Sequence, residues 1–228
     1  MAKALAVLRT LGTASGLLLL ALLINIQAVA YSVNWYQAEF ARLQSYQNIG
    51  TTLQEVERFS RQTTRFLMGR ESDPNMEMVM GGVERSFLNE KEVAHMRDVQ
   101  RLFSWARWLT LGLLLPLILW GILAHRHRSA PAYWRAMFQA SVCALLLGLL
   151  AAFLIAQDFT QAFDRFHELA FSNDLWMLDP RQDQLINLLP EQFFADAAAT
   201  AVLRTGGQLL LLAGATFWLS RRAADRFV

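Results

Sequence analysis

Two of the four histidines stand where they could do acid–base chemistry. His95 lies roughly two to three helical turns before one long apolar run, and His167 lies roughly two turns after the end of another. An unperturbed imidazole, with a pKa of about 6.5, can both give and take a proton near neutral pH. If the segments around these residues pack together, the two rings could meet and share the proton transfers of one reaction.

Polar neighbours strengthen this hypothesis for both histidines. Asp98 follows His95 by three residues, on the same helical face, where it could orient the ring and select its tautomer. His167 is followed by Asn173-Asp174-Leu175-Trp176, a polar and aromatic group. Acids and amides close to lipid are unfavourable unless they face a cavity or a partner. We therefore predict that His95 and His167 face one polar pocket.

Other chemistries find less support in the sequence. His167-Glu168 begins like the helical zinc motif, but Phe171 stands where the second histidine ligand would be. A metal site of His95, His167 and one carboxylate, serving a membrane hydrolase, stays open as an alternative. The sequence contains no Gly-x-Ser-x-Gly motif and no phosphate-binding glycine loop. Cys143 is the only cysteine and lies within an apolar run, so we expect neither a disulfide nor a reactive thiol. We expect no metal and no cofactor.

The apolar residues gather in four long runs. Hydrophobic residues make up 54% of the 228 residues, and a helix needs ~20 apolar residues to cross a bilayer. We predict transmembrane spans at about 11–31, 105–124, 136–157 and 197–219. Ala28-Val29-Ala30 resembles a signal-peptidase site, but the preceding run is long for a signal sequence and carries Asn25 and Gln27. We therefore treat the first run as an uncleaved span.

Basic residues mark one side of these spans. They lie before the first span, between the second and third, and after the fourth: Lys3, Arg9, Arg126, Arg128, Arg135, Arg221, Arg222 and Arg226. Basic residues in short loops are retained in the cytoplasm. Both ends of the chain are thus predicted to be cytoplasmic, and the charges require no nucleic acid to explain them. His125 and His127 alternate with arginines in the same region and are expected to be solvated.

The remaining segments, about 32–104 and 158–196, are then predicted to lie outside the cytoplasm. Capping patterns at Thr52/Glu55 and Asn89/Glu92 predict helix starts. Residues 71–82 contain Asp-Pro and Gly-Gly and should form a loop or an irregular turn. No segment alternates with period two for long, so no substantial sheet is expected. The predicted fold is one all-α membrane domain over residues 1–228, with four spans and a small, mainly helical extracytoplasmic cap.

Two stretches resemble one bacterial family of integral membrane proteins. One runs from His167 to Asp196 and includes Asn173-Asp174-Leu175-Trp176-Met177-Leu178-Asp179-Pro180; the other is Glu92-Val-Ala-His-Met-Arg-Asp-Val99. The family they resemble includes the lipoprotein intramolecular transacylase. The resemblance extends over the whole layout of four spans, although only these two stretches are specific.

The resemblance implies an intramolecular acyl transfer. The acyl chain at the glyceryl sn-2 oxygen of a diacylglyceryl-modified lipoprotein would move to the free α-amine of its N-terminal cysteine. His95 and His167 would be the catalytic residues, and no cofactor would be needed. Partners would be such lipoproteins and membrane lipid. Residues expected to support catalysis or bind substrate are Asp98, Phe171, Asn173, Asp174, Trp176, Phe194 and Arg204. Aromatic residues including Phe193 could form a wall that confines the substrate.

Two other functions compete with this one. A membrane binding or assembly subunit would use the cap to hold a partner, and its two histidines would be apart or dispensable. A transporter is less favoured, because the four spans lack paired broken helices or charges at mid-depth.

Overall fold

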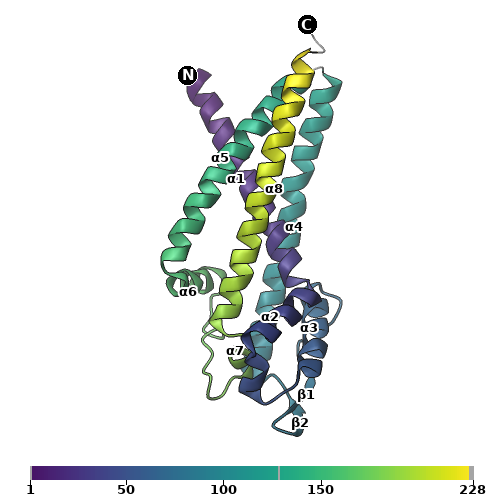
Figure 1. Cartoon of the computed structure of the whole chain (residues 1–228), viewed down its shortest axis with the longest axis vertical. Coiled ribbons are helices and arrows are strands. Elements are labelled where there is room, and N and C mark those ends of the chain that lie inside the picture. Colours follow the sequence, from purple (N-terminus) through teal and green to yellow (C-terminus); the bar gives the residue numbers. More distant parts are fainter. Residues whose placement is uncertain (1, 128, 226–228) are drawn as a thin grey trace. The chain divides into compact units, whose positions relative to one another are not determined.

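The structure, a computed structural model, describes residues 2–127 and 129–225 and is mainly helical (Figure 1). In chain order its elements are α1 (Ala2–Ala30), α2 (Val33–Leu43), the 3₁₀ helix η1 (Ser45–Ile49), α3 (Leu53–Leu67), β1 (Glu77–Met80), β2 (Val83–Ser86), α4 (Glu90–Arg126), α5 (Ala130–Gln157), α6 (Phe159–Ala170), α7 (Gln184–Leu188) and α8 (Glu191–Asp225). Arg128 and Arg226, which belong to the basic pattern, lie outside the described residues.

In the part of the chain that the structure describes, four helices are long and apolar enough to cross a membrane: Val7–Ala30 within α1, α4, α5, and Glu191–Ala223 within α8. Each predicted span lies within one of these helices to within one residue. The apolar part of α4 begins near Trp108. Its first turns carry Glu90, Lys91, Glu92, Arg97, Asp98 and Arg101. A segment with so many charges does not belong to the bilayer core, so His95 lies outside the membrane-spanning part of α4.

The chain divides into two compact units. The long-helix unit comprises residues up to 25, 107–157 and from 200 onward. Its interior contains small and aliphatic side chains of α1, α5 and α8, among them Ala14, Ala140 and Leu209. Large apolar side chains point outward instead, and Leu211 is 78% exposed. Small residues between helices and large apolar residues outside suit a lipid environment.

A buried polar contact joins α1 to α8 in the long-helix unit. The side-chain amide of Asn25 donates to Gln208 Oε1 at 2.8 Å and to Thr205 Oγ1 at 3.2 Å. Asn25 and Thr205 are both buried. Such interhelical hydrogen bonds stabilise helix packing in membranes by about 1 kcal/mol.

The short-helix unit comprises residues 26–106 and 158–199. The sequence predicts a cap of about residues 32–104 and 158–196, so the two sets of bounds are similar. Phe40, Phe59, Phe66 and Leu188 are among the side chains that form its apolar core. Both predicted helix starts are confirmed. Thr52 Oγ1 accepts a hydrogen bond from the Glu55 N–H, and Asn89 and Glu92 cap one another reciprocally.

A β-hairpin occupies part of the region where an irregular turn was expected. Strands β1 and β2 pair antiparallel, with Met80 opposite Val83. Gly81 and Gly82 connect them with φ of +61° and +80°, and a two-residue hairpin turn of this kind needs positive φ at both positions. Met78 and Met80 are buried on one face of β1. The alternation covers only four residues, too few to stand out in the sequence.

Candidate active site

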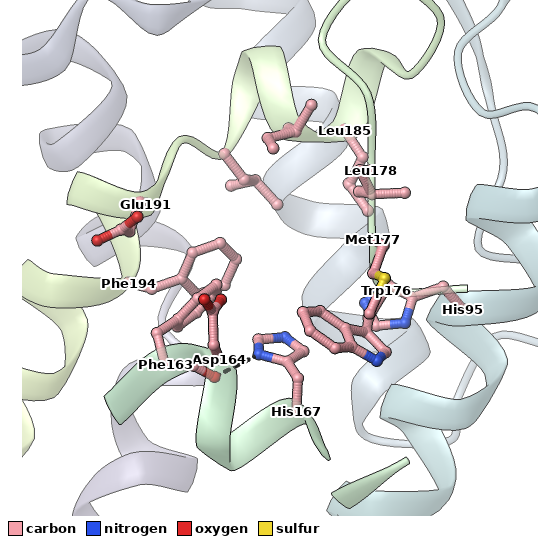
Figure 2. A pocket seen from close by; sticks show the side chains of 12 residues that line it. His95, Phe163, Asp164, His167, Trp176, Met177, Leu178, Leu185, Glu191 and Phe194 are labelled. Carbon is pink, nitrogen blue, oxygen red and sulfur yellow. Dashed lines mark hydrogen bonds between the residues drawn. The ribbon is translucent and has the colours of Figure 1, made fainter. Parts of the chain in front are cut away.

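The structure brings His95 and His167 together in the short-helix unit. Their ring centroids are 6.3 Å apart, and the two residues are only 7% and 8% exposed. Both line a pocket of about 470 Å³ (Figure 2). Most of the lining is apolar; the other lining residues are Phe163, Asp164, Trp176, Met177, Leu178, Leu185, Ile186, Leu189, Glu191 and Phe194. The pocket combines two imidazoles with two carboxylates in an otherwise apolar wall.

Helix α6 holds His167 in one orientation. Asp158 caps the start of this helix by accepting a hydrogen bond from the Gln161 N–H at 2.9 Å. One turn before His167, the carbonyl oxygen of Phe163 lies 2.7 Å from its Nδ1. A carbonyl can only accept a hydrogen bond, so Nδ1 carries the proton and Nε2 of the neutral ring is left as the proton acceptor. The indole of Trp176 stacks on this ring, with centroids 4.9 Å apart and an interplanar angle of 25°.

His95 is held neutral by its surroundings. The Phe171 ring meets it edge-on at 5.3 Å, and its Nδ1 is buried with no hydrogen-bond partner among the described residues. Burial lowers the pKa of His95 to about 4, because the charged imidazolium loses its hydration. A positive charge on His167 or on Lys91 acts in the same direction, and the Asp98 carboxylate opposes them. His95 is therefore uncharged at neutral pH.

A role of Asp98 in orienting the His95 ring would suggest a hydrogen bond between Asp98 and Nδ1 of His95. The structure has no such bond between these two residues. Its carboxylate accepts hydrogen bonds from Arg101 at 2.6 Å and from the Asn173 side chain at 3.0 Å. Arg101 lies three residues after Asp98 on α4 and forms an ion pair with its carboxylate. Through the hydrogen bond from Asn173, Asp98 connects α4 to the segment after α6. Asn173 in turn accepts a hydrogen bond from the Leu175 N–H.

The other candidate residues separate into those at the pocket and those elsewhere. Trp176 and Phe194 line the pocket, whereas Phe171 contacts both histidine rings. Asp174 is exposed and is not among the lining residues. Arg204 is exposed on α8 and belongs to the long-helix unit.

Phe193 is not part of the pocket wall. It is 3% exposed and packs in the core against Trp35, Tyr36 and Phe40, with centroids 5.0–5.3 Å apart. Neighbouring residues of a helix point in directions about 100° apart. Phe194 therefore faces the pocket, where its ring lies 5.2 Å from that of Phe163, while Phe193 faces the core.

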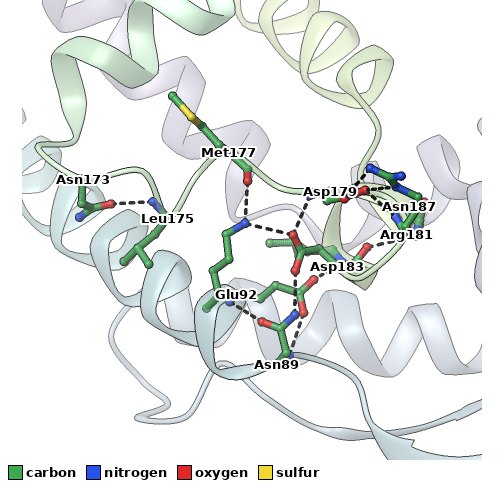
Figure 3. Close-up of polar contacts among 11 residues, drawn as sticks. Asn89, Glu92, Asn173, Leu175, Met177, Asp179, Arg181, Asp183 and Asn187 are labelled. Carbon is green, nitrogen blue, oxygen red and sulfur yellow. Dashed lines mark hydrogen bonds and ion pairs between the residues drawn. The ribbon is translucent and has the colours of Figure 1, made fainter.

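A buried polar network joins residues 177–183 to the start of α4 (Figure 3). Asp183, which is 2% exposed, accepts hydrogen bonds from the Asn89 side chain at 2.7 Å, the Asp179 N–H at 2.7 Å and Lys91 at 3.3 Å. Lys91 also donates to the carbonyl of Met177 at 2.6 Å. These bonds tie residues 177–183 to the helix that carries His95.

Glu92 extends this network to α7. It is fully buried, and its carboxylate accepts the Asn89 N–H at 2.8 Å and the Leu185 N–H at 2.6 Å. Burial raises the pKa of Glu92, although these hydrogen bonds act against the rise. Burial would also raise the pKa of Asp183, but hydrogen bonds from Asp179, Asn89 and Lys91 bring it below its ordinary value. The network positions Leu185 and Met177 at the pocket.

Sequence reasoning missed the two pocket carboxylates and the aliphatic wall. Asp164 lies three residues before His167 on α6, and this spacing was the available signal. Leu185, Ile186 and Leu189 lie in a stretch between Pro180 and Glu191 in which polar and aliphatic residues are mixed. Their shared role became visible only in the folded chain. Among residues 2–127 and 129–225, no three His, Cys, Asp or Glu side chains are grouped so that they could hold a metal ion.

A family model described as "Lipoprotein intramolecular transacylase Lit" matches residues 12–194. The chain belongs to the Lit family. Both histidines lie inside the matched region, and Arg204 lies beyond it. No curated protein matches the sequence.

Three solved structures, all of the membrane-integral lipoprotein intramolecular transacylase Lit from Bacillus cereus, have the same fold. The first has a TM-score of 0.79 at 21% identity and covers 99% of this chain and 100% of the other. A variant with one histidine replaced by arginine has a TM-score of 0.76 at 20% identity, covering 98% of this chain and 96% of the other. A variant with a histidine replaced by alanine also has a TM-score of 0.76 at 20% identity, covering 99% and 97%. Lit membership and the four apolar helices indicate a multi-pass membrane protein of an acyltransferase family.

Proposed function

We propose that this chain transfers an acyl chain within a bacterial lipoprotein, from the glyceryl sn-2 oxygen to the α-amine of the N-terminal cysteine. The observation that carries the proposal is the meeting of His95 and His167, 6.3 Å apart and buried in one largely apolar pocket. Family membership supports the same reaction class.

In the proposed mechanism His167 acts as the base. The α-amine nitrogen attacks the sn-2 ester carbonyl carbon and loses a proton to Nε2 of His167, which is free because Nδ1 donates to Phe163. The C–O bond then breaks and the C–N amide bond remains. The glyceryl oxygen takes up a proton and leaves as a free hydroxyl, so the reaction needs no other reactant. Stacking by Trp176 and the bond to Phe163 keep the base in place.

His95 is proposed to act as an uncharged donor. Its low pKa keeps it neutral, so a ring N–H can donate to the oxyanion of the tetrahedral intermediate and to the departing glyceryl oxygen. The proton accepted by His167 returns to the leaving oxygen directly or through His95. Each positioned acid or base contributes a factor of about 10²–10⁴ in rate.

The pocket wall is proposed to fold the substrate back on itself. Donor and acceptor belong to one molecule, so the main task is alignment, which can remove about 7–11 kcal/mol of the barrier. Leu178, Leu185 and Phe194 provide an apolar surface for the glyceryl group and the first part of its acyl chains.

We further propose that the short-helix unit lies on the extracytoplasmic face, with both chain ends in the cytoplasm. The support is the basic residues in the three short segments on the other side of the spans. A lipid-anchored amino terminus is presented at this outer face.

The test uses purified protein in lipid nanodiscs and a synthetic diacylglyceryl-cysteine peptide with a free amine. The product has the same mass as the substrate, so tandem mass spectrometry must locate the acyl chain on the nitrogen. We expect conversion by the wild type and a loss of about 10²–10⁴ in His95→Ala and in His167→Ala. If the two residues act as one unit, the double variant will be little slower than either single variant.

His125→Ala is the matched control, because His125 is an exposed histidine on α4 far along the helix from His95. It should retain wild-type activity. Binding of the peptide without conversion by the wild type would instead favour the binding-subunit function. Near-normal conversion by a well-inserted His95→Ala or His167→Ala would contradict the mechanism while leaving family membership intact.

A further inference from the structure

Two carboxylates line the pocket beside the histidines, and the proposed acyl transfer does not use them. Asp164 lies on α6, one turn before His167, and Glu191 is the first residue of α8. Figure 2 shows the Asp164 carboxylate and the His167 ring on the same side of the α6 ribbon. None of the described residues that line the pocket is a lysine or an arginine. A cation entering it would therefore find anionic side chains in the wall; the nearby Lys91 is bonded to Asp183 and to the carbonyl of Met177.

The two carboxylates differ in what already occupies them. Glu191 Oε1 accepts a hydrogen bond from the Thr160 hydroxyl at 2.6 Å. The Asp164 carboxylate has no hydrogen bond or ion pair with any residue of the described chain; the adjacent Arg165 pairs with Glu168. Asp164 is thus the carboxylate free to bind a ligand.

A second feature of the same pocket indicates a polar ligand. His95 is 7% exposed and lines the pocket, yet its buried Nδ1 has no partner within the described residues. Buried polar atoms without a partner are rare, and each calls for an explanation such as a bound group or a catalytic role. A free carboxylate on α6 and an unpartnered imidazole on α4 therefore border one space.

We propose that Asp164 binds the α-ammonium group of the substrate's N-terminal cysteine and so selects lipoproteins with a free amino terminus. This inference rests on the proposed acyl transfer, in which that amine is the nucleophile. An α-amino group with an ordinary pKa of about 7.7–8.0 is mostly charged at pH 7, so the pocket receives it as a cation. Bound at Asp164, the ammonium lies beside His167. Nε2 of His167 removes the extra proton of the ammonium and releases it to solvent, so Nε2 is again unprotonated and can act as the base when the neutral amine attacks.

The proposed contact acts on binding more than on the chemical step. A carboxylate stabilises the ammonium form and by itself opposes deprotonation. Loss of Asp164 should therefore raise KM without lowering kcat to a similar extent. Above about pH 9 the free amine is largely neutral, and the advantage of the carboxylate should disappear. A role of Asp164 in folding alone would produce neither the separation of KM from kcat nor the pH dependence.

The binding test uses a dialkylglyceryl-cysteine peptide, whose ether links cannot transfer an acyl group, with its amine either free or N-acetylated. We expect wild-type protein in nanodiscs at pH 7 to bind the free-amine peptide about tenfold more tightly than the acetylated one. Asp164→Asn should bind both peptides with nearly equal affinity. Glu168→Gln is the matched control, because Glu168 lies on the same helix, is exposed and loses the same charge, but does not line the pocket. It should keep the tenfold preference.

The kinetic test uses the diester peptide. Asp164→Asn should raise KM about tenfold at pH 7, leave kcat within about threefold, and approach the wild-type KM near pH 9.5. Equal binding of the two ether peptides by the wild type would overturn the proposal, whatever the variants do. An undiminished preference in Asp164→Asn would overturn it as well. Failure of the wild type to convert the diester peptide would instead contradict the proposed function, while the preference for the free amine could still be measured.

Discussion

The low pKa of His95 makes the stability of the protein depend on pH in a way that one substitution should remove. The folded protein holds His95 neutral until the pH approaches 4, whereas the unfolded chain binds a proton near pH 6.5. The contribution of His95 to the free energy of unfolding is therefore fully present above about pH 6.5 and is lost as the pH falls through that value toward 4. The lowering of the pKa from 6.5 to about 4 corresponds to a stabilisation of about 3 kcal/mol, and about 2 kcal/mol of this should be lost by pH 5.

The experiment compares wild type with His95→Gln, which has no titrating ring. Thermal unfolding is followed by tryptophan fluorescence in detergent micelles between pH 7 and pH 5. For a chain of this length 1 kcal/mol shifts Tm by about 2–4 °C, so Tm of the wild type should fall by about 4–8 °C more than Tm of His95→Gln. Glu92 and Asp183 also titrate in acid, but both proteins contain them, so their contributions cancel in the comparison.

His125→Gln is the control, because His125 is exposed on α4. It should show the full pH dependence of the wild type. If Tm of His95→Gln falls between pH 7 and pH 5 by as much as Tm of the wild type, then the fold does not hold His95 neutral. The role of His95 as an uncharged hydrogen-bond donor would have to be abandoned with it.

Asp183→Asn should destabilise the protein by about 2–4 kcal/mol, because it removes a buried charge that Lys91 and two other donors bond; an unchanged Tm would show that the network is dispensable. Trp176→Ala should slow acyl migration by up to about tenfold through loss of the stack on His167, whereas Trp176→Phe should keep most of the rate, and equal rates for the two variants would argue against the stack. Cys143→Ala should convert the diester peptide at nearly the wild-type rate, since Cys143 lies within α5 in the long-helix unit, outside the pocket-bearing unit. Incubation with a chelator should leave activity unchanged, and loss of activity that zinc restores would favour the metal-dependent alternative.

Local signals in the sequence were enough for the four apolar helices and for the starts of α3 and α4, but not for the β-hairpin. The four spans follow from runs of apolar residues long enough to cross a bilayer, because length and composition decide that property without reference to neighbours. The starts of α3 and α4 follow from Thr52/Glu55 and Asn89/Glu92, because capping bonds form between residues three positions apart. The resemblance of two stretches also indicated the Lit family, and the match of the family model to residues 12–194 establishes it.

Long-range packing decided the rest. The sequence suggested that His95 and His167 could meet, but the tautomer of His167 follows from the Phe163 carbonyl, and the neutrality of His95 follows from burial. Phe193 and Phe194 are equivalent as aromatic residues in the sequence, and only the packing of α8 sends one to the core and the other to the pocket.

The buried carboxylates show the same dependence on tertiary structure. Glu92 was recognisable as a capping residue, but its second bond, to the N–H of Leu185, joins positions 93 residues apart. Asp183 likewise bonds Asn89, which caps α4, and Lys91 in its first turn, and no local pattern predicts these partners. Composition and short spacings determine where helices begin, end and enter a membrane, because those properties depend on neighbouring residues. The environment that gives each pocket side chain its charge and orientation depends on residues far along the chain, and it exists only once the chain has folded.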